Sequence, residues 1–345
     1  MTMLALDQDQ QGNVMEMRSF GRTGMRFSIL GFGCGAVGGL MVRGDPADQE
    51  RTVARALDAG VNYFDTAVQY GDGASETNLG RVLKTLKPAN AFVGTKVRLA
   101  RQEFGRIGAA IAASLEGSLR RLGLERVDIF HLHNSIADGA PGALSEPQVL
   151  DEVVPAFEKL RGEGKLRFPG LTAVGDTAAL QRVIDTGAFS SAQVTYNMLN
   201  PSAAAPLPAN YPAQDYRRLF DHTAAAGTGV VAIRVLAGGA LSGSPERHPI
   251  ASPPPEPIGS AKSYDADLAR ARRLMPLVTE GFAASLTEAA TRFSLAHPGV
   301  GTILVGIATP AQFDTALAAV AKGPLPQAAL DRIKELQGGF AGEAR

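Results

Sequence analysis

Four polar residues, well separated along the chain, have types that suit the reduction of a carbonyl group. Asp65 and Tyr70 lie five residues apart in the segment GVNYFDTAVQYG, whereas Lys96 and His133 each end a later apolar run, in FVGTKV and VDIFHLH. Such a reduction needs a hydride at the carbonyl carbon and a proton for the developing alkoxide. A tyrosine is a reluctant proton donor at neutral pH, because its ordinary pKa is ~10. The other three residues are of types that can tune a tyrosine for this task.

Each of these partners has a separate role in the prediction. A lysine ammonium beside the phenol favours the phenolate and lowers the pKa of Tyr70. An aspartate paired with that lysine keeps the ammonium charged despite partial burial, so Lys96 and Asp65 are expected to tune Tyr70. His133, near the same oxygen, can donate a hydrogen bond that orients the substrate carbonyl. The set lacks only a hydride source, which a bound nicotinamide would supply.

The elements that position these residues follow a repeated pattern of a short apolar run and then a helical stretch. This alternation predicts a parallel sheet with crossover helices, and its spacing fits the eight units of an α/β fold, the (β/α)8 TIM barrel. Three of the four residues then end successive strands at the C-terminal face, where barrel enzymes place their chemistry. The expected strands are 28–32, 63–65, 91–96, 127–133, 167–172, 192–196, 229–233 and 302–306, and the expected helices include 48–59, 75–86, 106–122 and 147–163.

Three segments lie outside this repeat. Residues 1–14 are expected to form a flexible N-terminal tail, and residues 15–345 a single barrel domain. The run MRSFGRTGMRF predicts a β-hairpin around its Gly-Arg-Thr-Gly turn, placed to close the bottom of the barrel. A long loop, 242–276, connects the seventh and eighth strands, and we expect it to fold over a ligand because loops of this length are usually functional or mobile.

With these residues in place, the sequence resembles the aldo-keto reductases, as a bacterial-type member. The resemblance is carried by GVNYFDTAxxYG, the GTK strand end, DIFHLH and the C-terminal HPGVGTILVG, and it extends from the hairpin to Val320. It implies an NAD(P)H-dependent oxidoreductase that reduces a small aldehyde or ketone to an alcohol. By resemblance Tyr70 is the general acid, Lys96 and Asp65 tune it, and His133 orients the substrate.

The resemblance also implies which residues hold the cofactor. Gln193 of QVTYN would hold the nicotinamide carboxamide, and Gly306 and Gln312 would lie near the adenosine end. Residues of VLAGGALSG would line the pyrophosphate, namely Leu236, Gly238, Leu241 and Gly243.

Around the nicotinamide, several positions differ from the family pattern. The family's usual Ser-Asn after the fifth strand reads Thr172-Ala173, which loses one carboxamide contact. The aromatic residue that usually stacks on the nicotinamide reads Ile233. Arg234 follows it, and this side chain is expected to bind substrate or cofactor or to form a structural salt bridge.

The choice between the two nicotinamide cofactors depends on the adenosine end. The resemblance implies NADP(H) in preference to NAD(H). Ala308 and Ala316, however, stand where a basic residue and an asparagine are common. The chain therefore lacks a basic partner for a 2′-phosphate there, which weakens the case for NADPH over NADH.

The overall composition excludes several classes of protein. Lys plus Arg equals Asp plus Glu at 34 each, so no net positive field attracts nucleic acid or an anionic membrane surface. The single cysteine, Cys34, excludes an intramolecular disulfide and an all-cysteine metal site, and no metal is expected. Residues 1–13 do not read as a secretory signal, and no window approaches the ~20 apolar residues that cross a bilayer. The expected location is the cytoplasm, and the sequence leaves the oligomeric state open.

Other interpretations fit parts of the sequence. Gly33 to Gly38 satisfies GxGxxG after a strand, as in a dinucleotide-binding sheet, but nine residues separate Gly38 from the next helix. Lys96 would form a Schiff base in a barrel lyase, and a weakly catalytic, nucleotide-sensing interaction protein would share the fold. His131 shares a strand face with His133, and we expect it to lie deeper in the barrel and to be hydrogen-bonded.

Overall fold

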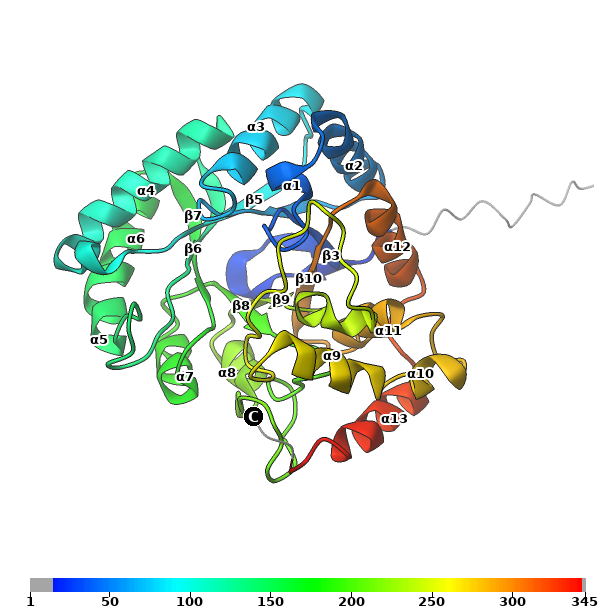
Figure 1. Ribbon diagram of the computed structural model, residues 1–345. Helices are drawn as coiled ribbons and strands as arrows, with labels where there is room; N and C mark the ends of the chain where they lie inside the picture. Colours follow the sequence, from blue (N-terminus) through cyan, green and yellow to red (C-terminus); the bar gives the residue numbers. More distant parts are fainter. Residues whose placement is uncertain (1–14, 343–345) are drawn as a thin grey trace, which may run out of the picture.

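The computed structural model describes residues 15–342, which contain a closed barrel of eight parallel strands (Figure 1). The order around the barrel is β10-β3-β4-β5-β6-β7-β8-β9, so the last strand closes against the first. The (β/α)8 TIM barrel expected from the sequence is therefore confirmed, whereas the expected tail lies outside the described residues. The barrel strands are β3 (Leu30–Gly33), β4 (Tyr63–Asp65), β5 (Phe92–Val97), β6 (Val127–Leu132), β7 (Leu166–Thr172), β8 (Ser191–Thr195), β9 (Gly229–Ile233) and β10 (Val300–Gly306).

Helices surround the barrel and cover its outer face (Figure 1). Helix α2 illustrates how the sequence sets a boundary: the Asp45 carboxylate accepts from the Ala47 amide, and Pro46 occupies the first turn. None of the helices within residues 15–342 is long and apolar enough to cross a membrane. The helices are α1 (Leu40–Arg43), α2 (Pro46–Asp58), α3 (Ala74–Leu86), α4 (Ile107–Leu122), α5 (Glu146–Gln148), α6 (Val154–Gly162), α7 (Thr177–Asp185), α8 (Leu219–Ala225), α9 (Tyr264–Arg272), α10 (Pro276–Thr279), α11 (Leu286–Leu295), α12 (Pro310–Ala321) and α13 (Gln327–Gly338).

Two expected elements are interrupted in the structure. The expected strand 28–32 is split, because Ser28 ends a hairpin strand and its hydroxyl donates to the Leu30 carbonyl at the break. The expected helix 147–163 consists of α5, a π-helical turn over Val149–Val153, and α6. Pro155 lies just beyond that turn and has no N–H for a regular helical bond, which accounts for the irregularity.

The N-terminal hairpin closes the bottom of the barrel, as expected. Its strands β1 (Met17–Ser19) and β2 (Arg26–Ser28) pair antiparallel, and the rings of Phe20 and Phe27 lie 4.3 Å apart, fully buried. A Cβ on Gly229, the first residue of β9, would lie 2.6 Å from the Phe20 ring. We call Phe20 and Phe27 the aromatic plug.

The long connection after β9 reaches across to the loop that follows β3. We call residues 243–263 the strap. Arg247 donates to the carbonyls of Gly238 and Ser252, both at 2.8 Å. From the other side, Arg43 donates to the Ile250 carbonyl at 2.6 Å. Figure 1 shows this yellow segment extending toward α1. The strap ends at Ser263, which caps α9, a helix that the sequence did not predict.

The aromatic plug leads to a prediction about stability. Phe20→Ala would leave a cavity among wholly buried side chains and should lower the free energy of unfolding by about 3–5 kcal/mol. Chemical denaturation measures this change. Met275→Ala removes a side chain that is 40% exposed, and it should change the free energy by no more than about 0.5 kcal/mol. Equal stability of the two variants would contradict the role of the plug.

Candidate active site

The four candidate residues meet at the C-terminal end of the barrel. Asp65 is the last residue of β4, Lys96 is the penultimate residue of β5, and His133 directly follows β6. Tyr70 lies in the loop between β4 and α3. The side chains of Asp65 and Lys96 are buried, whereas Tyr70 and His133 are half-buried. The barrel thus places two buried charges beneath two side chains that reach toward solvent.

The ammonium of Lys96 has three hydrogen-bond acceptors. It donates to Asp65 Oδ1, to the Thr66 carbonyl at 2.8 Å and to the Tyr70 hydroxyl at 3.3 Å. An ammonium has three N–H donors and no acceptor. The phenol oxygen of Tyr70 therefore accepts from Lys96, and its own O–H remains available to another acceptor.

The carboxylate of Asp65 is held through both of its oxygens. Oδ1 accepts from Lys96, while Oδ2 accepts from Gln193 Nε2 at 2.5 Å and from the Tyr63 hydroxyl at 3.1 Å. Tyr63 is a partner of Asp65 that was not predicted from the sequence. The signal was present, because residues two apart on a strand point to the same face.

The two histidines occupy different depths. The His133 ring lies edge-on to Tyr70, with ring centroids 6.1 Å apart, and its Nδ1 is 3.4 Å from Gln69 Oε1. His131 is fully buried, and its Nε2 lies 3.0 Å from the Ser191 hydroxyl. Of the two rings, His133 is therefore the one that lies beside the candidate acid.

Burial and charge act in opposite directions on the tyrosine and the lysine. Burial raises the pKa of Tyr70 above its ordinary value, and Lys96 opposes this without cancelling it. The expectation that the pKa of Tyr70 falls below its ordinary value is therefore wrong for this structure. Burial also lowers the pKa of Lys96, but Asp65 and Tyr70 outweigh it, so that pKa is raised. Tyr70 stays protonated and Lys96 stays charged at neutral pH.

The residues expected to hold a nicotinamide lie at the same end of the barrel, on β7, β8 and β9, the three strands that follow β6 in the barrel order. Thr172 ends β7 and Ile233 ends β9, and Arg234 follows with a φ of 57°, which is rare for a residue other than glycine. Gln193 of β8 lies between them but directs its amide to Asp65. The hydroxyls of Thr172 and Thr195 are buried without a hydrogen-bond partner among the described residues. Such orphaned groups fit a polar ligand.

The residues expected near the pyrophosphate follow β9 directly. Leu236, Gly238, Leu241 and Gly243 lie in or beside the 3₁₀ segment Ala237–Ser242. The φ angles of Gly238 and Gly243, 70° and 76°, require a conformation that suits glycine. Arg247 of the strap donates to the Gly238 carbonyl, so the strap covers this segment.

The residues expected near the adenosine are joined to the loop after β3. Gly306 ends β10, and a Cβ there would lie 3.5 Å from the Gly38 nitrogen. Gln312 of α12 accepts from the Ala308 amide at 2.8 Å, so its side chain shapes the short connection between β10 and α12.

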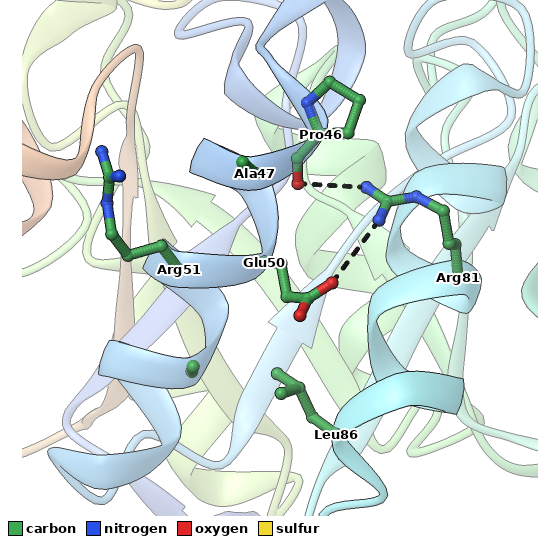
Figure 2. A pocket seen from close by; sticks show the side chains of 7 residues that line it. Pro46, Ala47, Glu50, Arg51, Arg81 and Leu86 are labelled. Carbon is green, nitrogen blue, oxygen red and sulfur yellow. Dashed lines mark hydrogen bonds and ion pairs between the residues drawn. The ribbon is translucent and has the colours of Figure 1, made fainter.

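Two surface hollows lie away from these residues. One, of about 380 Å³, lies between α2 and α3 on the outside of the barrel, where Arg81 forms an ion pair with Glu50 at 3.8 Å (Figure 2). The other, of about 850 Å³, lies near the starts of β5 and β6. No group of His, Cys, Asp and Glu suited to a metal occurs within residues 15–342. The cluster of Asp65, Tyr70, Lys96 and His133 is therefore the candidate for catalysis.

Comparisons with known proteins agree with this geometry. A model of the Aldo/keto reductase family matches residues 29–337. L-galactose dehydrogenase from Arabidopsis thaliana is 30% identical over 313 residues, covering 89% of this chain and 88% of that protein. D-threo-aldose 1-dehydrogenase from Pseudomonas sp is 31% identical over 250 residues, covering 64% and 69%. The holo form of aldo-keto reductase AKR11C1 from Bacillus halodurans has a TM-score of 0.70 at 25% identity, with 93% and 96% covered.

The surroundings of His133 give a prediction about its charge. Burial, together with the positive charges of Lys96 and Arg98, lowers the pKa of His133 to about 3. Since a histidine is neutral above its pKa, this imidazole should not titrate between about pH 5 and about pH 8. Nitrogen NMR of the histidine rings checks this, with His133→Asn assigning the signal. A titration midpoint near the ordinary histidine value would contradict the prediction.

Proposed function

This chain belongs to the aldo/keto reductase family, and we propose that it reduces an aldehyde or a ketone to an alcohol with Tyr70 as the general acid. One observation carries the proposal. All three protons of the Lys96 ammonium are directed to Asp65, Thr66 and Tyr70, which leaves the Tyr70 O–H as a proton donor for a substrate oxygen. The family match and the relatives named as dehydrogenases support oxidoreductase chemistry at this site.

The residues divide the work of proton transfer. Tyr70 donates its proton to the oxygen on which negative charge develops, and the adjacent Lys96 ammonium stabilises the phenolate that remains. Asp65 holds that ammonium in place and keeps it charged. Neutral His133 has one N–H, and a carbonyl oxygen only accepts hydrogen bonds. The proposed role therefore uses the tautomer with the proton on Nε2, in which Nδ1 makes no hydrogen bond to Gln69 Oε1, 3.4 Å away. When bound, a nicotinamide supplies the hydride.

We propose that the cofactor is held by the residues on the β7, β8 and β9 side of the barrel mouth. The unpartnered hydroxyls of Thr172 and Thr195 support a carboxamide site there, together with Gln193, Ile233 and Arg234. The strap and the glycine-containing segment that it covers would enclose the pyrophosphate, with Leu236, Gly238, Leu241 and Gly243. Gly306 and Gln312 would lie at the adenosine end.

We propose that the protein prefers NADP(H) to NAD(H), and this proposal rests on the family alone. The positions 308 and 316 carry no basic side chain for a 2′-phosphate. Titration of the protein with each nucleotide, followed by fluorescence, measures the preference. The cytoplasmic location stays a prediction.

The surroundings of Lys96 weigh against Schiff-base chemistry. A Schiff base requires a neutral amine as nucleophile. Asp65 and Tyr70 outweigh burial and raise the pKa of Lys96, and the side chain is fully buried. The described residues therefore favour the reductase over a barrel lyase.

The first test of the proposal is Tyr70→Phe. Loss of the general acid should lower kcat for aldehyde reduction by about 10²- to 10⁴-fold. Nucleotide binding should persist, because the expected cofactor residues lie on other strands. Steady-state kinetics and fluorescence titration measure the two quantities separately. A turnover rate close to that of the unsubstituted protein would show that another group donates the proton.

A second test is Lys96→Met, which removes the charge that opposes burial at Tyr70. The pKa of Tyr70 should then rise further, so the alkaline limb of the kcat profile should move to higher pH while turnover falls. The variant leaves Asp65 buried without its cation, at a cost of about 3–5 kcal/mol in stability. The double variant Asp65→Asn with Lys96→Met relieves that cost and should show a smaller shift in the same direction, because the charge of Asp65, which raises the pKa of Tyr70, is also removed. An unchanged pH profile in both variants would contradict the coupling.

A further inference from the structure

Tyr63 is a second tyrosine in contact with the catalytic cluster, and it approaches Asp65 from inside the barrel. It is the first residue of β4 and is fully buried. Its hydroxyl lies 3.1 Å from Asp65 Oδ2. Because an ionised carboxylate only accepts hydrogen bonds, the phenol donates. Burial and the charge of Asp65 raise the pKa of Tyr63 well above its ordinary value, so this donor keeps its proton.

The barrel interior is shaped to hold the Tyr63 ring in one place. A Cβ on Gly94 of the neighbouring strand β5 would lie 2.4 Å from the Tyr63 hydroxyl, and one on Gly31 of β3 would lie 3.1 Å from the ring. Below, the ring stacks on Phe27 of the aromatic plug, with centroids 4.5 Å apart and an interplanar angle of 13°. The missing side chains at Gly31 and Gly94 form a slot, and the plug supports the ring from beneath.

This arrangement fixes the carboxylate of Asp65 in orientation. One oxygen accepts from Lys96, and the other accepts from Tyr63 and Gln193. A carboxylate held at both oxygens has little freedom to rotate. The ammonium that it binds is then held at 3.3 Å from the Tyr70 hydroxyl.

We propose that Tyr63 is a positioning residue for proton transfer: it orients Asp65, and through Asp65 it holds the ammonium of Lys96 against Tyr70. The inference deepens the proposed function and rests on it, since Tyr70 is the acid that the ammonium serves. Because Tyr63 is fully buried, we assign it no direct contact with substrate or cofactor. Its effect reaches Tyr70 through two intervening side chains.

The experiment compares Tyr63→Phe with the unsubstituted protein. The variant keeps the ring and its stacking on Phe27 but removes the hydroxyl. We expect kcat to fall by about tenfold, in line with the loss of one hydrogen bond to a charged group, while the nucleotide Kd is unchanged. The alkaline limb of the kcat profile should move to higher pH, because a less firmly held ammonium lowers the pKa of Tyr70 less. In the Lys96→Met background the same substitution should shift the limb no further.

A readout without turnover separates this inference from the proposed function. The side-chain ammonium of Lys96 should give a nitrogen NMR signal, identified by its loss in Lys96→Met. In Tyr63→Phe this signal should shift and broaden. If the unsubstituted protein reduced no carbonyl compound, the proposed function would fail. The ammonium signal would still test whether Tyr63 holds Lys96 in position.

The matched control is Tyr211→Phe. Tyr211 is also a buried tyrosine, and its hydroxyl donates to the Leu199 carbonyl at the same 3.1 Å. Its substitution should leave the pH limb and the ammonium signal unchanged. Tyr63 would lose its assigned role if Tyr63→Phe kept the kcat, pH limb and ammonium signal of the unsubstituted protein. Equal shifts in the Tyr211→Phe control would overturn the inference as well.

Discussion

The buried ion pair between Lys96 and Asp65 is the interaction on which the candidate site depends. Two charges removed from water are stable together only when their remaining donors and acceptors are satisfied. Here the Thr66 carbonyl takes one ammonium proton, and Tyr63 and Gln193 saturate the second carboxylate oxygen. The pair is therefore fixed by residues from β4, β5 and β8, and closure of the barrel is a condition for its geometry.

The sequence was sufficient to predict the architecture because the signal for each strand is local. Apolar runs bounded by polar residues predicted β4 and β9 to the residue and the other barrel strands to within a few residues. Two features with a weak or irregular apolar pattern were missed. The buried residues of α9 include the charged Asp267 and Arg270, so its apolar pattern is weak, and its start is marked by the Ser263 cap. The π-helical turn before Pro155 depends on an irregular bond pattern that periodicity does not reveal.

The site was predictable in its residue types and less so in its electrostatics. The spacing of Asp65, Tyr70 and Lys96 indicated an acid with a tuning pair, and the structure brings these side chains together. The direction of the tyrosine pKa depends on how deeply the phenol lies, which no spacing encodes. The bond from Gln193 to Asp65 joins residues 128 positions apart, so it exists only once β8 and β4 face each other across the interior.

The aromatic plug also determines how molecules reach the site. Phe20 and Phe27 are fully buried and packed against each other at the base, so among the described residues that end of the barrel is filled by side chains. Under the proposed function, both reactants must then use the opposite mouth, part of which the strap already crosses. A substrate and a cofactor that use the same opening can block each other's entry and release. Under that proposal, the reactant that lies deeper would bind first and leave last, so the filled base of the barrel would favour an ordered sequence of binding.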